Sequence, residues 1–435
     1  MKKSNKVIAL VVGFYSIVNY AQNAASITNE GVLFVSTGEL ISFEGNFINT
    51  EEGNVNNDGT AIYYNSFIND GAYGMTTHKN TSVTLFTTGE NTTKAKQIAG
   101  NQLASFHHVV FNSAVNQVAF DLKNNIDVSG NVDFQNGIIQ VDSTYNPITK
   151  LSNGMFTFKK GATVEHVSDA SHIQGAIEKI GNEAFTYPSG DKGKYRYARI
   201  SAPKGTTDVF VGEYVYNDSA FFDARPNAVG VVKQINKQEY WIIDKGSEKQ
   251  SDVLITLSWD EDTTAPDVLT NPEEDLHIVR WDPKQQLWVD EGGVVDMSTK
   301  EVTTVATVQG YGFFTLATVK KEWVTEGDVV IYNLVSANGD GKNDYFIIEN
   351  IRNYPNNKVE IFNRWGTRVY ETTGYDPHGD GSENVFKGYS EGKATLDKGS
   401  KLPSGTYYYV VTYEYKDDNG SRMIKKAANL HLETN

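Results

Sequence analysis

The sequence predicts an all-β protein built from several successive domains. Its 435 residues are too many for one hydrophobic core. Tyrosine (24) and phenylalanine (21) are abundant, and aromatic residues are enriched in strands. After the N-terminus, no stretch keeps the periodicity of an amphipathic helix. We therefore expect a β-helix or solenoid-like domain in residues 22–200, a β-sandwich in residues 201–325 and a further strand-rich domain in residues 326–435.

The composition argues against several classes of function. The formal net charge is -15, and nucleic-acid binding needs clustered lysine and arginine, so we expect no nucleic-acid partner. The chain has no cysteine. Disulfide scaffolds, thiolate metal sites and cysteine nucleophiles are therefore excluded, and so is the lipid anchor of a lipoprotein.

Residues 1–21 have the pattern of a secretory signal peptide. Lys2, Lys3 and Lys6 precede an apolar run over residues 7–18, and small residues then favour cleavage after Ala21. A membrane anchor is the weaker reading, because the run is shorter than the roughly 18–20 residues that a span needs. No later segment is long enough either, so the mature chain is expected to be exported without a transmembrane segment.

A short repeat marks the N-terminal domain. Phe47 and Phe67 occupy matching places, as do Asn49 and Asn69, at an offset of 20 residues. In β-prone sequence this period indicates a solenoid whose coils stack strand on strand, with asparagine amides stacking between coils. An antiparallel β-sandwich is the alternative. Alternating apolar residues continue toward residue 141, and Asn136-Gly137 signals a tight turn.

The central segment contains separated strands joined by longer loops, which favours a β-sandwich. Four tryptophans fall on these strands: Trp241, Trp259, Trp281 and Trp288. Apolar strands carrying large aromatic residues are typical of a sandwich core, so we expect core packing rather than a platform for stacking sugars.

The last segment is again strand-rich, with a hairpin turn expected at residues 417–420. One loop places oxygen-bearing side chains at a spacing close to that of a calcium loop: Ser336, Asn338, Asp340 and Asp344. Ser336 stands where an acid is expected, and Ile347 stands where a bidentate Glu is expected. Asx turns without a metal are the favoured interpretation. Residues 376–381 are a second near-match, made poorer by His378.

Four motifs of this segment occur in the order that a known family shows. Asn338 to Asp344 reads NGDGKND, and it is followed by YPNN at residues 354–357, FNRWG at residues 362–366 and PSGTYYY at residues 403–409. Ala337 replaces the usual proline. The segment closely resembles the gliding-motility-associated C-terminal domain, the type B sorting domain of the type 9 secretion system of Bacteroidetes. The motif residues are Asn338, Gly339, Asp340, Gly341, Asn343, Asp344, Asn363, Arg364, Trp365, Gly366, Gly405, Thr406 and Tyr407.

This resemblance implies an immunoglobulin-like sandwich and export in two steps. The signal peptide would deliver the chain to the periplasm, and the type 9 translocon would then read the C-terminal domain. Cargo of this type often stays at the cell surface, tethered through an outer-membrane β-barrel partner, and many such proteins are adhesins or motility components. Release into the medium stays open.

For the rest of the chain we expect a binding function and no catalysis. The alternative is a secreted polysaccharide lyase or hydrolase on a β-helix, which needs paired carboxylates or a metal cluster on one face. The carboxylates available are irregularly spaced: Asp121, Asp127, Asp133 and Asp142. His107 and His108 are adjacent, and neighbours on one strand point to opposite faces, so we do not expect them to share an ion. Surface glycans or a protein partner are the expected ligands.

Overall fold

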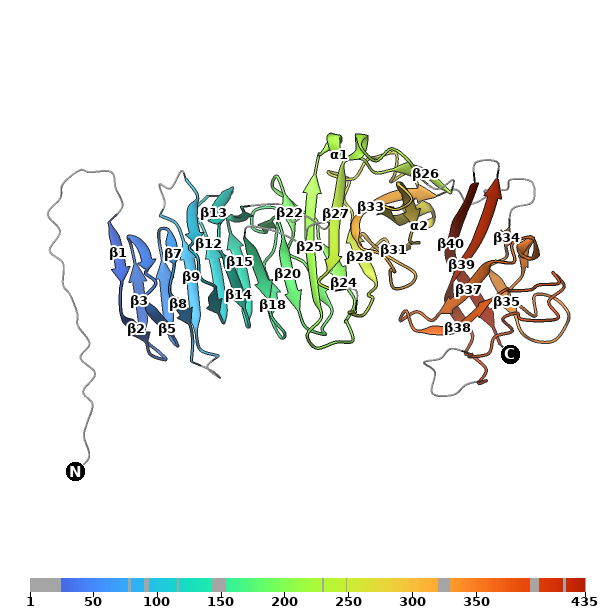
Figure 1. The fold of residues 1–435 in the computed structure, drawn as a ribbon, viewed down its shortest axis with the longest axis horizontal. Coiled ribbons are helices and arrows are strands. Elements are labelled where there is room, and N and C mark those ends of the chain that lie inside the picture. The colour runs from blue at the N-terminus through green and yellow to red at the C-terminus, as the bar shows by residue number, and fades with distance from the viewer. Residues whose placement is uncertain are drawn as a thin grey trace, which may run out of the picture.

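The computed structural model describes residues 25–76, 80–89, 94–115, 117–142, 154–228, 231–247, 249–319, 329–391, 399–417 and 420–434. The expected signal peptide lies outside these residues. The prediction of an all-β fold is confirmed, because the described residues form strands with only three short helical turns. Figure 1 shows the strands following one another along the long axis of the molecule.

Three parallel sheets make up the N-terminal domain, and the chain visits them in turn, adding one strand to each sheet per coil. The first sheet contains β1 (Ser26–Asn29), β4 (Asn46–Asn49), β7 (Phe67–Asn69), β10 (Lys96–Ala99), β13 (Val118–Leu122), β16 (Ile138–Val141) and β19 (Ile173–Gln174). The second begins with β2 (Val32–Val35), β5 (Asn54–Asn57), β8 (Ala72–Gly74), β11 (Ala104–Phe106), β14 (Asn125–Val128), β17 (Met155–Phe158) and β20 (Ile177–Ile180). The third contains β3 (Leu40–Phe43), β6 (Thr60–Tyr63), β9 (Val83–Thr87), β12 (His108–Asn112), β15 (Asn131–Asn136) and β18 (Thr163–Glu165). This is the stacking of a β-helix, so the sandwich alternative for this domain is wrong.

The predicted repeat corresponds to neighbouring coils. Phe47 pairs with Phe67 and Asn49 pairs with Asn69 between β4 and β7. The Asn49 Nδ2 atom donates to Asn69 Oδ1 at 2.8 Å, and Asn29 Nδ2 donates to Asn49 Oδ1 at the same distance. The predicted amide stacking is thus confirmed. Alternate residues point inward, where rings such as Phe47, Phe67 and Phe86 pack on one another along the domain axis.

The central strands continue the second sheet of the β-helix. β20 pairs antiparallel with β25, and this end of the solenoid is therefore covered. The sheet goes on through β25 (Val209–Tyr216), β27 (Glu239–Lys245), β33 (Gly312–Val319), β29 (Leu276–Asp282) and β30 (Leu287–Asp290), with β26 (Val232–Ile235) also paired to β33. A smaller sheet is formed by β21 (Phe185–Thr186), β24 (Ala198–Ile200), β28 (Ile255–Ser258), β32 (Glu301–Thr303) and β31 (Val294–Asp296).

Short elements complete this region: β22 (Gly190–Asp191), which pairs with β23 (Lys194–Tyr195), and the helices α1 (Ser219–Asp223) and α2 (Pro272–Asp275). Trp241, Trp281 and Trp288 lie on strands and Trp259 directly follows β28; each is at most 5% exposed, which confirms that they are core residues. The indole N–H of Trp241 donates to the Arg196 carbonyl at 3.1 Å, and that of Trp288 donates to the Arg225 carbonyl at 2.9 Å. The polar atoms of Trp241 and Trp288 are thus satisfied inside the core, whereas the buried Trp259 Nε1 has no hydrogen-bond partner among the described residues.

The C-terminal domain is a sandwich-like unit with its own core. Its main sheet has the order β35 (Leu334–Ser336), β40 (Gly420–Glu433), β39 (Gly405–Asp417), β37 (Asn357–Phe362) and β38 (Arg368–Thr373). A second, two-stranded sheet pairs β34 (Val330–Ile331) with β36 (Ile348–Glu349), and η1 (Ile351–Asn353) follows. The expected hairpin joins β39 to β40, although residues 418–419 of its turn lie outside the described residues.

Candidate functional site

The main sheet of the C-terminal domain uses its two faces differently. Alternate residues of a strand point to opposite faces. Val359 and Ile361 of β37 pack into the core of the domain itself, whereas the neighbouring Phe362 packs with Val410 and Ala427 in a second cluster. That second cluster also contains Val305 and Ala306 of the central domain. The outer face of this sheet therefore contacts the central domain.

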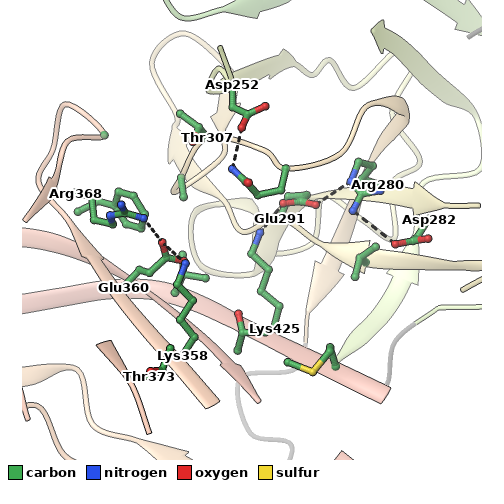
Figure 2. Close-up of a pocket in the computed structure, with 18 of the residues that line it drawn as sticks. Asp252, Arg280, Asp282, Glu291, Thr307, Lys358, Glu360, Arg368, Thr373 and Lys425 are labelled. Atoms are coloured by element: carbon green, nitrogen blue, oxygen red, sulfur yellow. Dashed lines mark hydrogen bonds and ion pairs between the residues drawn. The ribbon is translucent and has the colours of Figure 1, made fainter. Parts of the chain in front are cut away.

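A buried carboxylate joins the two domains. The Glu291 side chain is only 4% exposed, and its Oε2 accepts a 2.5 Å hydrogen bond from Lys425 Nζ of β40. Its Oε1 accepts from Arg280 Nε at 3.0 Å. Figure 2 shows Lys425 and Arg280 reaching this carboxylate from opposite sides. A buried carboxylate needs compensating charge, which Arg280 supplies from the same domain and Lys425 supplies across the interface.

A cleft of about 1070 Å³, lined by many charged and polar residues, lies along this interface. On the C-terminal side, Lys358 and Arg368 both contact Glu360, at 2.9 and 2.7 Å. On the central side, Gln309 Nε2 donates to Asp252 Oδ2 at 3.2 Å. These charged groups are already paired with one another, so the cleft offers little net charge to a ligand.

The loop that resembles a calcium site is folded by its own backbone amides. The Asp344 carboxylate accepts from Gly339 N and Gly341 N, both at 2.7 Å. Asp340 Oδ1 accepts from Lys342 N at 2.8 Å, and Asn338 Oδ1 accepts from Asp340 N at 3.0 Å. Both glycines have positive φ, at 80° and 83°, which glycine adopts without strain. These are the contacts of Asx turns, and calcium ligation by Ser336, Asn338, Asp340 and Asp344 stays a prediction.

Two further parts of the predicted motif form a tight turn and a strand start. Asn363 Oδ1 accepts from Trp365 N at 3.0 Å and from Thr367 N at 2.9 Å, which closes the turn between β37 and β38. The Tyr407 side chain is buried at the start of β39, and its hydroxyl donates to the Pro403 carbonyl at 2.9 Å. Tyr407 is thus a structural residue, whereas Trp365 is exposed.

The three motif segments, distant in sequence, lie at the same end of one sheet. Ser336 at the end of β35 pairs with Glu433 at the end of β40, and Gly405 pairs with Leu432. Phe362, which ends β37, pairs with Tyr408 near the start of β39. Since neighbouring strands lie roughly 4.8 Å apart, the segments spread over about 14 Å along this end. These three motif segments are therefore brought to one end of the sheet, whereas the YPNN motif at residues 354–357 lies at the other end of β37.

The four carboxylates considered for catalysis do not form one cluster, although Asp121 and Asp142 share a lysine. Asp121 lies on β13 of the first sheet and contacts Lys123 at 3.2 Å, and Asp142, which follows β16 of the same sheet, lies 4.0 Å from that lysine. Asp127 lies on the second sheet and contacts Lys159 at 2.8 Å, whereas Asp133 lies on the third sheet and contacts His166. In the part of the chain that the structure describes, no group of three His, Asp or Glu side chains could hold a metal.

The adjacent histidines differ from expectation. His107 lies between β11 and β12, at a corner of the coil, so it does not alternate with His108 as a strand neighbour would. The two ring centroids are 4.3 Å apart, which makes the prediction of opposite faces wrong. Burial and the neighbouring imidazole lower the pKa of His107, whose Nδ1 is 3.0 Å from Ser129 Oγ. Both His107 and Asp127 border a hollow of about 670 Å³.

Comparison with known protein families matches residues 329–427 to the CHU_C type IX secretion signal domain. Residues 329–427 are a type IX secretion signal domain. The match includes all the predicted motif residues, from Asn338 to Tyr407. Comparisons with curated proteins and with solved structures give no match.

The type IX secretion signal domain marks the chain as cargo of that secretion system and supports export to the cell surface or the extracellular space. As cargo of this system, the chain interacts with the secretion machinery. Among the described residues, no helix combines the length and hydropathy that a membrane span requires. Sequence reasoning missed the Lys425–Glu291–Arg280 contact, because nothing local links residues that are 134 positions apart.

Proposed function

We propose that this protein is a non-enzymatic surface protein that stays at the cell surface after type IX export. There it acts as an adhesin or gliding-motility accessory and binds a partner through the free end of its β-helix. The resemblance to type B cargo supports retention through an outer-membrane β-barrel partner. The observation that carries the proposal is the surface of the first coil, β1 to β3.

The first coil exposes large apolar side chains where the next coil has polar ones. Val32, Phe34 and Leu40 are 77%, 52% and 65% exposed. Their register partners on the second coil are Asn54, Asn56 and Thr60, respectively. Terminal repeats of a solenoid normally present a polar outer face. Apolar residues at these outward positions therefore favour an interaction surface.

Within the part of the chain that the structure describes, the same coil also has no strand partner on its outer side. In each of the three sheets, the strand of the first coil is the outermost one among the described residues. Unpaired strand edges are templates for pairing with another chain. Residues 25–76 contain seven acidic residues and no lysine or arginine. The partner that fits is a protein with an apolar or strand-edge surface ringed by basic residues.

A binding role accords with the distribution of carboxylates better than an enzymatic role does. Asp121, Asp127 and Asp133 lie on three different sheets, and each contacts a cationic or imidazole group. Glycosidases need two carboxyl groups within about 10 Å across one substrate. Asp121 and Asp142 meet this distance, but the Lys123 ammonium contacts both carboxylates and occupies the place that a sugar would need. Robust turnover on a panel of plant and algal polysaccharides, abolished by Asp127→Asn, would overturn the proposal.

The test exchanges the outward residues of the first coil for those of the second. The variant carries Val32→Asn, Phe34→Asn and Leu40→Thr in the full chain, expressed in the native host. We expect surface display at the wild-type level, measured by protease added to intact cells. Attachment of the cells to a substratum should fall about fivefold or more. Outer-membrane proteins recovered with the immunoprecipitated protein give the second readout.

The matched control is Leu103→Thr, which removes a 49%-exposed leucine from a later coil. It should change neither attachment nor the recovered proteins. If the first-coil variant attaches as well as the wild type and recovers the same proteins, the first coil is not the binding surface. Attachment that is unchanged on deleting the whole gene would refute the adhesin role itself.

A further inference from the structure

One tryptophan of this protein lies in solvent. Among the described tryptophans, Trp241, Trp259, Trp281 and Trp288 are at most 5% exposed, whereas Trp365 is 69% exposed. An indole buries a large apolar area when it packs. Trp365 does not use that area for the fold, so the area is available to a partner.

The turn that carries Trp365 is rigid. Besides the two amides that Asn363 Oδ1 accepts, the Asn363 N–H donates to the Thr367 carbonyl at 2.9 Å, and the Gly366 N–H donates to the Asn363 carbonyl at 2.9 Å. Gly366 has φ at 73°, which a side chain would strain. Four hydrogen bonds thus fix the backbone that presents the indole, and this lowers the entropy lost when a partner binds it.

Arg364 stacks on the same indole. Its guanidinium carbon lies 4.3 Å from the ring centroid, and its side chain is exposed. Among the described residues, no carboxylate contacts this guanidinium. Tryptophan and arginine are the residue types most enriched at the energetic centres of protein interfaces. The pair therefore presents an exposed indole ring and a positive charge side by side.

The backbone of the turn is seated on the central domain. A Cβ atom added at Gly366 would lie 2.8 Å from Leu254 Cδ1, so the backbone of the turn is in close contact with the central domain. Gly366 borders the cleft between the two domains. The indole remains exposed even though its own turn is packed, and the packing of the two domains does not account for it.

We propose that the Arg364–Trp365 turn is the docking element of the signal domain. Trp365 inserts into an indole-sized apolar pocket on a protein component of the type IX secretion machinery. A carboxylate beside that pocket pairs with Arg364. This rests on export by that system. The partner contacts the turn beside the central domain, so it meets the signal domain together with folded cargo.

The test uses the full chain in its native host. Protease added to intact cells measures the surface fraction of wild type, Trp365→Ala, Arg364→Glu and a chain lacking residues 327–435. We expect Trp365→Ala and Arg364→Glu to lower the surface fraction at least about tenfold, because a truncated interface tryptophan commonly weakens binding by that factor or more. Trp365→Phe should restore part of it.

Tyr389→Ala is the matched control, since Tyr389 is a 43%-exposed aromatic residue of the same domain. It should be exported normally. The melting temperature of each purified variant should equal that of the wild type, because the indole is largely in solvent. Normal export of Trp365→Ala alongside retention of the truncated chain overturns this inference and leaves type IX export intact. If the truncated chain is exported normally, export does not depend on the signal domain, and the assignment to type IX export is refuted.

Discussion

Replacing Asn49 by alanine should loosen the N-terminal coils of the β-helix. Asn49 is fully buried, donates to Asn69 Oδ1 at 2.8 Å and to the Ala72 carbonyl at 3.0 Å, and accepts from Asn29 Nδ2 at 2.8 Å. In Asn49→Ala, Asn29 Nδ2 keeps the Gly31 carbonyl, whereas the buried Asn69 Oδ1 has no donor. A buried acceptor without a partner costs about 1–3 kcal/mol, and the lost hydrogen bonds add about 1 kcal/mol. We expect a loss of about 2–4 kcal/mol.

Native-state hydrogen exchange is the suitable assay, because a multidomain chain has no single free energy of unfolding. Amides of β4 and β7 should exchange faster by the factor that corresponds to this loss, while amides of the C-terminal domain stay unchanged. Asn56→Ala is the control, since Asn56 donates only to the neighbouring Asn54 side chain at the surface. The reasoning is refuted if Asn49→Ala accelerates exchange no more than Asn56→Ala does.

Three further outcomes are expected. Burial lowers the pKa of His172, so the folded state favours the neutral imidazole. The resulting stability is present above about pH 6.5 and is lost as the pH falls through the folded pKa. In His172→Gln, the melting temperature should therefore change less between pH 7 and pH 5 than it does in the wild type. Lys425→Met should destabilise the domain interface by about 1–3 kcal/mol in calorimetry, because the buried Glu291 carboxylate then has only Arg280 as a cationic partner. Lys416→Met is the control: Lys416 pairs with Glu414 at the surface, so its loss should have little effect. Asp344→Ala should lower the melting temperature of the C-terminal domain equally with and without calcium, because both oxygens of this carboxylate accept hydrogen bonds from backbone amides. If the melting temperature of the wild type falls when calcium is chelated, the loop binds calcium instead.

The sequence predicted those features that repeat or that occur within a few residues of one another. The offset of 20 residues was visible because Phe47 and Phe67 are adjacent in the β4–β7 register. The next coil is longer, since Phe67 pairs with Ile98, and the repeat is lost from view there although the parallel stacking continues. Insertions at coil corners change the spacing without changing the sheet.

Features that depend on distant contacts could not be read from the sequence. The pairing of β20 with β25, which makes the central strands an extension of the β-helix sheet, follows from tertiary packing alone. The corner at His107 likewise interrupts an apparently continuous strand pattern. The motif residues were found by resemblance, but the difference between a buried Tyr407 and an exposed Trp365 appeared only in the fold.

The signal domain at residues 329–427 is the basis of the functional account, and its role is tested most directly by fusing residues 327–435 to a reporter that carries a signal peptide. In the native host, the reporter should reach the cell surface or the medium, while the parent chain lacking these residues should stay in the periplasm. A reporter that remains periplasmic, or a truncated chain that is exported normally, would contradict the account.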